Sequence, residues 1–176
     1  RISHLLKGLR KNESCAIIGA GPIGHLCAQA LHLKGYKVCV FDQDPKRLSY
    51  FSDSGIETRS DLRTIDGFRM VIEATGDPKA LEASLKRSSP GTTHLLLGLP
   101  YSRRPFNFED VVAYDRTILG SVGSTGEDFA EAIKLLPKLP TDAFLECILP
   151  LEEYKTAWEK FRRRDHLKVL LKVSGE

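Results

Sequence analysis

Long apolar segments are missing from this sequence. Its purely apolar runs reach only three or four residues, as in Leu95-Leu96-Leu97. Because a helix that spans a bilayer needs about 20 predominantly apolar residues, we expect no membrane partner. No charged stretch followed by an apolar one opens the sequence, so we expect no secretory signal either.

Cysteine and histidine pairs of the kind that bind metals are also absent. Cys15, Cys27, Cys39 and Cys147 are separated by 12, 12 and 108 positions, without any C-x-x-C pattern. Zinc sites need ligands at short, repeated spacings, so we predict no metal site within this chain. Two of the cysteines lie in apolar strand-like runs, where a reduced thiol behaves as a small hydrophobe. Reduced thiols indicate a cytoplasmic protein.

The chain has little excess charge of either sign. Its 26 Lys and Arg residues against 23 Asp and Glu residues give a formal charge of +3. This excess is too small to indicate a surface that binds polyanions. The run Arg162-Arg163-Arg164 ends a predicted helix, where cations interact favourably with the helix dipole. We therefore expect no nucleic-acid partner.

Strand-like and helix-like segments alternate along most of the chain. Strands are predicted over 15–18, 38–41, 56–58, 70–74, 93–97 and 117–119, and helices over 23–33, 45–51, 78–87 and 127–136. This alternation is typical of a parallel sheet with helices on both faces. The fold class predicted is therefore α/β, a doubly wound Rossmann fold with a six-stranded parallel sheet.

The pattern changes after Leu136-Pro137-Lys138-Leu139-Pro140, where two prolines interrupt it. Beyond this point a helix is predicted over 151–161 and a strand over 167–173. We divide the chain into a sheet domain, 1–140, and a C-terminal helix-strand tail, 141–176. Ile2, Leu5, Leu6 and Leu9 predict an opening helix over 1–10. Because the sequence starts with Arg1 inside this pattern, we expect a piece of a longer protein.

A glycine-rich turn links the first predicted strand to the first helix of the sheet domain. Gly19-Ala20-Gly21-Pro22-Ile23-Gly24 matches the G-x-G-x-x-G dinucleotide-binding pattern. Gly19 permits the tight turn, Gly21 lets a pyrophosphate approach the backbone, and Gly24 lets the helix pack near the sheet. The first-turn N–H groups and the helix dipole then face the phosphates. Pro22 has no N–H, so Ile23 and Gly24 are the predicted donors.

An acidic residue ends the second predicted strand, as the dinucleotide pattern requires. Asp42 lies 18 residues beyond Gly24, close to the distance of about 20 expected for the acid that binds the ribose. Its carboxylate would accept hydrogen bonds from the ribose hydroxyls and repel a 2′-phosphate. NAD is therefore predicted rather than NADP, although Lys46 and Arg47 lie close enough to offset the repulsion.

Several motifs together resemble the nucleotide-binding domain of medium-chain dehydrogenases, the alcohol, sorbitol and threonine dehydrogenase group. The most specific is Val71-Ile72-Glu73-Ala74-Thr75-Gly76, which resembles the family's fourth strand. Leu95-Leu96-Leu97-Gly98-Leu99-Pro100 is similar to the fifth strand and its exit, and Ile118-Leu119-Gly120-Ser121 to the sixth. Segments 150–153 and 168–172 resemble the C-terminal end of the family. The resemblance covers nearly the whole chain.

The resemblance implies further cofactor-binding residues. Ala74, Thr75 and Gly76 would line the cofactor cleft, and Gly98 and Leu99 would lie beside the nicotinamide. The backbone of Leu119 would meet the carboxamide, and Arg47 would lie near the adenosine ribose. The resemblance also implies a separate N-terminal domain that holds the catalytic zinc, and the tail 141–176 would join it. We assign no catalytic residue here, and we expect His25 to be an ordinary helix residue.

The implied function is the cofactor-binding part of an NAD-dependent alcohol or polyol dehydrogenase. Hydride would pass between a secondary alcohol and NAD, and this fragment alone would be inactive. A non-catalytic module that binds or senses NAD is one alternative. A zinc-free, NADPH-dependent relative of quinone reductases is another, against which Asp42 argues. Relatives pair through their sixth strands, so we also expect a homodimer formed through 117–121.

Overall fold

A computed structural model describes residues 13–99 and 105–173 of the chain. The opening helix predicted over 1–10 and Pro100 of the fifth-strand motif lie outside the described residues. The chain divides into two compact units, the first extending to Pro137 and the second starting at Lys138.

All six predicted strands of the first unit are present, and they form one parallel sheet. The strand order is β3-β2-β1-β4-β5-β6, which is the order of the Rossmann dinucleotide-binding fold. This confirms the predicted fold class. The strands are β1 Ser14–Ile18, β2 Lys37–Phe41, β3 Glu57–Arg59, β4 Met70–Glu73, β5 Thr93–Leu96 and β6 Thr117–Gly120.

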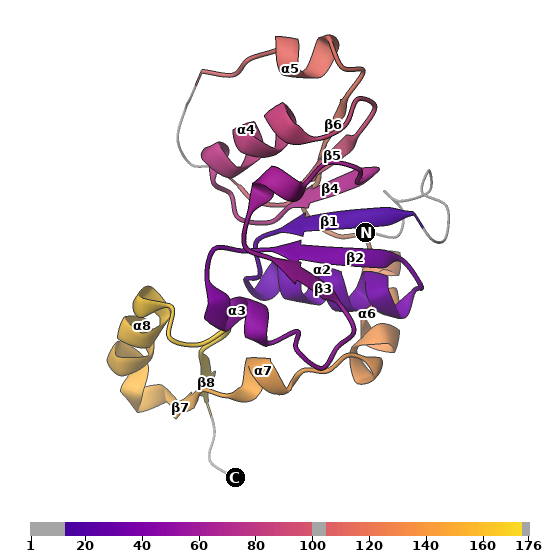
Figure 1. Ribbon diagram of the computed structural model, residues 1–176. Helices are drawn as coiled ribbons and strands as arrows, with labels where there is room; N and C mark the ends of the chain where they lie inside the picture. The colour runs from indigo at the N-terminus through magenta and orange to yellow at the C-terminus, as the bar shows by residue number, and fades with distance from the viewer. Residues whose placement is uncertain (1–12, 100–104, 174–176) are drawn as a thin grey trace. The chain divides into compact units, whose positions relative to one another are not determined.

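Helices connect these strands, as the alternating pattern predicts (Figure 1). Three of them begin with proline, whose fixed φ suits the first helical position. They are α2 Pro22–Leu33, α3 Pro45–Ser49 and α4 Pro78–Arg87. The others are the short α5 Glu109–Val112, the 3-10 turn η1 Leu62–Thr64 and α6 Gly126–Leu135.

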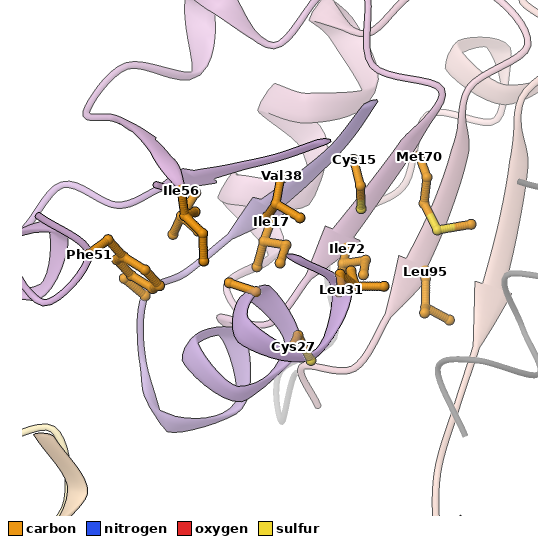
Figure 2. Close-up of a cluster of buried hydrophobic side chains, with 13 residues drawn as sticks. Cys15, Ile17, Cys27, Leu31, Val38, Phe51, Ile56, Met70, Ile72 and Leu95 are labelled. Atoms are coloured by element: carbon orange, nitrogen blue, oxygen red, sulfur yellow. The ribbon is translucent and has the colours of Figure 1, made fainter. Parts of the chain in front are cut away.

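Two buried clusters cover the two faces of the sheet, because side chains alternate along each strand. The first cluster joins Cys15 and Ile17 of β1 to Leu31 of α2, and Figure 2 shows its side chains gathered between strands and helix. The second cluster takes the alternate residues Ala16 and Ile18, with η1 and α4 packed on that face. Helices therefore lie on both faces of the sheet.

The strand register places equivalent residues side by side across the sheet. Ile17 pairs with Ile72, Ile72 with Leu95, and Leu95 with Leu119. Because all strands of a parallel sheet point the same way, their carboxyl ends lie along one side of the sheet. The segments that follow β1, β2, β4 and β5 meet there. Most of the predicted site residues lie at these carboxyl ends.

The second unit contains more elements than the sequence predicted. They are α7 Asp142–Leu145, β7 Ile148–Pro150, the 3-10 turn η3 Leu151–Glu153, α8 Tyr154–Arg163 and β8 Leu170–Lys172. The 3-10 turn η2 Leu136–Lys138 comes just before them. The predicted helix over 151–161 is confirmed as η3 and α8, and the predicted strand over 167–173 is shorter in the structure. β7 was not predicted; it pairs in parallel with β8.

Basic residues end helix α8, as predicted. Arg162 and Arg163 lie in its last turn, and Arg164 caps it in the left-handed conformation with φ 61°. Their charges therefore lie at the negative end of the helix dipole. Among the described residues, no helix has the length and apolar character needed to cross a bilayer.

Candidate dinucleotide-binding site

The glycine turn after β1 is held close to the sheet by its backbone. Gly19 has a φ of +100°, a conformation that glycine adopts readily and other residues avoid. Its N–H donates to the carbonyl oxygen of Phe41 at 2.7 Å. A Cβ on Gly24 would overlap the carbonyl oxygen of Gly19. Glycine at position 24 therefore lets α2 start directly against the turn.

Helix α2 begins without a side-chain cap. Its N-cap is Gly21, with φ −70° and ψ −178°, and its first turn contains no acidic residue. By contrast, α3 and α4 are capped by the carboxylates of Asp44 and Asp77, which accept from backbone N–H groups two residues on, both at 2.9 Å. A helix N-terminus carries orphan N–H donors and a partial positive charge. The start of α2 can therefore hold an anion such as a diphosphate.

Gly21 is the one glycine of the turn around which there is room. A Cβ at this position would have only the Nη1 atom of Arg47 nearby, at 3.7 Å. The guanidinium of Arg47 thus lies beside the start of α2 and is largely buried, with a side chain 21% exposed. A cationic group in this position adds to the attraction for an anion at the glycine turn.

Asp42 is bound to the glycine turn directly. Its Oδ2 atom accepts from the backbone N–H of Ala20 at 2.7 Å, and its Oδ1 atom accepts from the N–H of Asp44 at 2.9 Å. The Nη1 atom of Arg47 lies 3.9 Å from Oδ2. Because each carboxylate oxygen has about two acceptor positions, Asp42 can still accept from the hydroxyls of a ribose.

The segment after β4 lies against the glycine turn. The N–H of Ala74 donates to the carbonyl oxygen of Ile18 at 2.9 Å, which continues the pairing of the two strands. A Cβ on Gly19 would lie 2.7 Å from the Cγ2 atom of Thr75. Two of the segments assigned to the cofactor are therefore in contact without a ligand.

The segments after β4 and β5 also meet. Gly76 has a φ of +71°, and a Cβ there would lie 3.2 Å from the carbonyl oxygen of Leu99. The side chain of Leu99 is 65% exposed. Leu119 lies two strands from β4, within β6, where it packs against the cluster on the α2 face. The structure thus brings the predicted residues of β1, β2, β4 and β5 together and leaves Leu119 further along the sheet.

Glu73, the last residue of β4, was not predicted as a site residue. It is 3% exposed, and its carboxylate accepts hydrogen bonds from the segment that follows it. The sequence did contain a signal: Glu73 directly follows the apolar residues Met70-Val71-Ile72 of a strand buried on both faces. A buried carboxylate needs several hydrogen-bond donors. Its presence at the end of a buried strand therefore indicates that the following turn donates hydrogen bonds to it.

His25 is a helix residue, as expected. It is buried in α2, and its ring centroid lies 4.5 Å from that of Phe51. Burial lowers the pKa of its imidazole. In the described part of the chain, no group of three or more His, Cys, Asp or Glu side chains is arranged to hold a metal ion.

Comparisons with known proteins agree with this arrangement. Residues 22–138 match the family model described as zinc-binding dehydrogenase. The L-threonine 3-dehydrogenase of Legionella pneumophila is 26% identical over 176 residues, which cover 90% of this chain and 51% of that protein. The chain spans about half the length of the curated relatives it matches.

Solved structures show the same fold. Alcohol dehydrogenase TADH from Thermus sp. ATN1 has a TM-score of 0.82 at 27% identity, with 97% of this chain and 55% of that one covered. Glucose dehydrogenase from Haloferax mediterranei, solved with NADP, zinc and gluconolactone, has a TM-score of 0.76 at 21% identity, with coverages of 99% and 55%. This chain belongs to the zinc-binding dehydrogenase family, in which it corresponds to the nicotinamide-dinucleotide-binding domain.

Proposed function

We propose that this chain binds NAD as the cofactor-binding part of an alcohol or polyol dehydrogenase. The bound nicotinamide would supply the acceptor for hydride from a secondary alcohol. The matches to named dehydrogenases support this activity over a module that only binds or senses NAD. We assign no catalytic residue to this chain, and the fragment alone is expected to be inactive.

One observation supports the proposal most strongly. The start of α2 lacks a side-chain cap, and Asp42 is bonded to Ala20 immediately before it. In the proposed complex, the N–H groups of Ile23 and Gly24 hold the diphosphate, and Asp42 accepts from the adenosine ribose. Gly19, Gly21 and Pro22 shape the turn without donating to the ligand.

The environment of Asp42 favours NAD over NADP. A 2′-phosphate on the ribose would come close to this carboxylate and be repelled. Arg47 would reduce the repulsion, but it lies 3.9 Å from Asp42 and 3.7 Å from a carboxylate oxygen of Asp44. Its charge is therefore shared between two carboxylates, which leaves less attraction for a third anion.

The nicotinamide half of NAD is assigned to the segments after β4 and β5. Ala74, Thr75 and Gly76 would line one side, with Gly98 and Leu99 beside the ring. The large exposed surface of Leu99 suits contact with the face of a planar ring. The assignment of Leu119 to the carboxamide rests on the resemblance alone.

Isothermal titration of the chain with NAD and with NADP tests this assignment. We expect NAD to bind more tightly than NADP. Asp42→Ala should reduce the ratio of the two affinities by about tenfold or more, since one charge-assisted hydrogen bond is worth roughly 1.5–3 kcal/mol. Asp53→Ala removes an exposed carboxylate and serves as the matched control. Equal affinity of the unmutated chain for NAD and NADP would contradict the proposal.

The C-terminal tail, 141–176, which lies within the second unit, is proposed to join a zinc-holding catalytic domain outside this chain. Helix α8 exposes Tyr154, Trp158 and Phe161, with exposed fractions of 54%, 61% and 58%. Their spacing places the three rings on one face of the helix. An exposed aromatic face of this kind is typical of an interface. Zinc would then be held by that other domain and not by residues of this one.

A homodimer through β6 is also proposed. β6 is an edge strand of the sheet, and an unpaired edge is a natural place for a second copy to add its strand. Light scattering of the chain tests this, and a monomer at micromolar concentration would contradict it.

We further propose a cytoplasmic location, supported by four buried, free cysteine thiols.

A further inference from the structure

We propose that Glu73 is a positioning residue for the nicotinamide half of the dinucleotide. In this role its carboxylate fixes the segment after β4, and that segment in turn contacts the segment after β5 beside which that half would lie. The inference rests on the proposed function and concerns which part of the ligand depends on this buried side chain.

The carboxylate of Glu73 accepts hydrogen bonds from the turn that follows β4. Its Oε1 atom accepts from the N–H of Thr75 at 2.6 Å, from the hydroxyl of Thr75, and from the N–H of Gly76 at 3.1 Å. Its Oε2 atom lies 3.2 Å from the same Gly76 nitrogen. All these groups donate, which is the pattern that a carboxylate requires. One side chain therefore holds both Thr75 and Gly76 in place.

The backbone of Glu73 also holds the chain that follows β5, and its carboxylate lies against that chain. Its carbonyl oxygen accepts from the N–H groups of Leu97 at 2.8 Å and Gly98 at 3.0 Å. A Cβ on Gly98 would lie 2.6 Å from the Oε2 atom of Glu73 and would overlap Gly76. The two segments therefore touch through glycine backbone, with the Glu73 carboxylate beneath the contact.

Thr75 extends this arrangement toward the glycine turn. Its hydroxyl donates to Glu73 and accepts from the N–H of Asp77 at 2.9 Å, and Asp77 in turn caps α4. The methyl group of Thr75 faces Gly19, where it leaves no room for a side chain. The position of Thr75 relative to the glycine turn therefore depends on the bond to Glu73.

Replacing Glu73 with glutamine tests the carboxylate with almost no change of volume. The amide oxygen can take the place of Oε1, but the NH2 group at the position of Oε2 would then face the N–H of Gly76. A donor facing a donor leaves buried polar groups unpaired. The segments after β4 and β5 would shift, whereas Asp42 and the start of α2 keep their own hydrogen bonds.

The experiment compares two ligands by calorimetry: NAD, and ADP, which shares the adenosine and diphosphate but lacks the nicotinamide riboside. For Glu73→Gln we expect about tenfold weaker binding of NAD and a change of less than about twofold for ADP. Glu109→Gln, which removes an exposed carboxylate on α5, is the control and should change neither. Thr75→Val, which removes the hydroxyl that donates to Glu73, should reproduce the selective loss, and this variant decides the question if Glu73→Gln does not fold.

Unchanged NAD affinity in Glu73→Gln would overturn the inference. So would an equal loss of NAD and ADP affinity, because that result indicates a general structural role. If the unmutated chain binds neither ligand, the proposed function fails, and this inference fails with it. If the unmutated chain binds both ligands but Glu73→Gln does not weaken NAD binding more than ADP binding, this inference fails and the proposed function stands.

Discussion

The carboxylate of Asp42 and the backbone N–H of Ala20 form a hydrogen bond of 2.7 Å. This bond ties the end of β2 to the turn that follows β1. The residue assigned to the ribose and the turn assigned to the phosphates therefore form one preorganised unit before any ligand binds. Preorganisation of this kind lowers the entropic cost of binding.

Gly24 is predicted to tolerate no side chain. Since a Cβ at this position would overlap the carbonyl oxygen of Gly19, Gly24→Ala must displace α2 from the sheet. We expect the free energy of unfolding to fall by about 3 kcal/mol or more, because overpacking against backbone cannot be relieved by a rotamer change. Urea denaturation measures this. Gly126→Ala, at the first position of α6 with open space around it, is the control and should be neutral or stabilising.

Much of the first unit was predictable because strong local signals agree with each other. Asp44 and Asp77 each precede a helix-starting proline, and both cap their helices as the sequence indicates. Gly35 follows α2 with a φ of +86°, as expected for a helix end. Boundaries were less certain: α3 ends at Ser49, two residues before its predicted end.

The elements that were missed are short and mostly exposed. α5 has four residues and β7 has three, so each is too short for its hydrophobic pattern to repeat clearly along the sequence. The role of Glu73 was missed for a different reason. Two of its donors are the backbone N–H groups of Thr75 and Gly76, which carry no side-chain signature.

Acid should destabilise the fold through His94. Burial, and then the nearby charge of Arg116, lower the pKa of His94 to about 4 from its ordinary value near 6.5. Because the unfolded chain then binds a proton that the folded chain does not, stability falls as the pH drops from 6.5 to 4. The loss attributable to this group is about 3 kcal/mol.

Chemical denaturation at pH 7 and at pH 4.5 checks this expectation. In His94→Gln the loss of stability between these two pH values should be smaller by roughly 2–3 kcal/mol. His32→Gln, on the exposed side of α2, should behave as the unmutated chain does. The same pH dependence in His94→Gln would show that other groups cause the acid instability.

Arg116 is predicted to stabilise the first unit through backbone carbonyl groups. Its guanidinium is buried, donates to the carbonyl oxygens of Asp110 at 2.6 Å and of Ser88, and lies 4.4 Å from the ring centroid of Tyr114. Arg116→Met leaves both carbonyl oxygens without these donors. We therefore expect the free energy of unfolding to fall by about 2–4 kcal/mol. Arg69→Met, at an exposed position, should cost little. A small effect at both sites in thermal unfolding would contradict the prediction.

The cysteines are predicted to react slowly in the folded chain. Burial raises the pKa of Cys27 and of Cys39 to about 12, and it raises the pKa of the Cys15 thiol further. Since the thiolate is the reactive form, a disulfide reagent at pH 8 should label these residues only slowly. In denaturant all four cysteines should react fast. Rapid labelling of Cys27 or Cys39 in the native state would contradict their burial.

The central claim is that the first turn of α2 holds the diphosphate of a dinucleotide. Titration of the 15N-labelled chain with NAD, followed by amide NMR, tests this most directly. The largest shifts are predicted for the donor amides of Ile23 and Gly24, together with that of Ala20, whose N–H is bonded to Asp42. Saturable binding that leaves these amides unchanged and shifts others would contradict the claim, as would the absence of any shift at millimolar NAD.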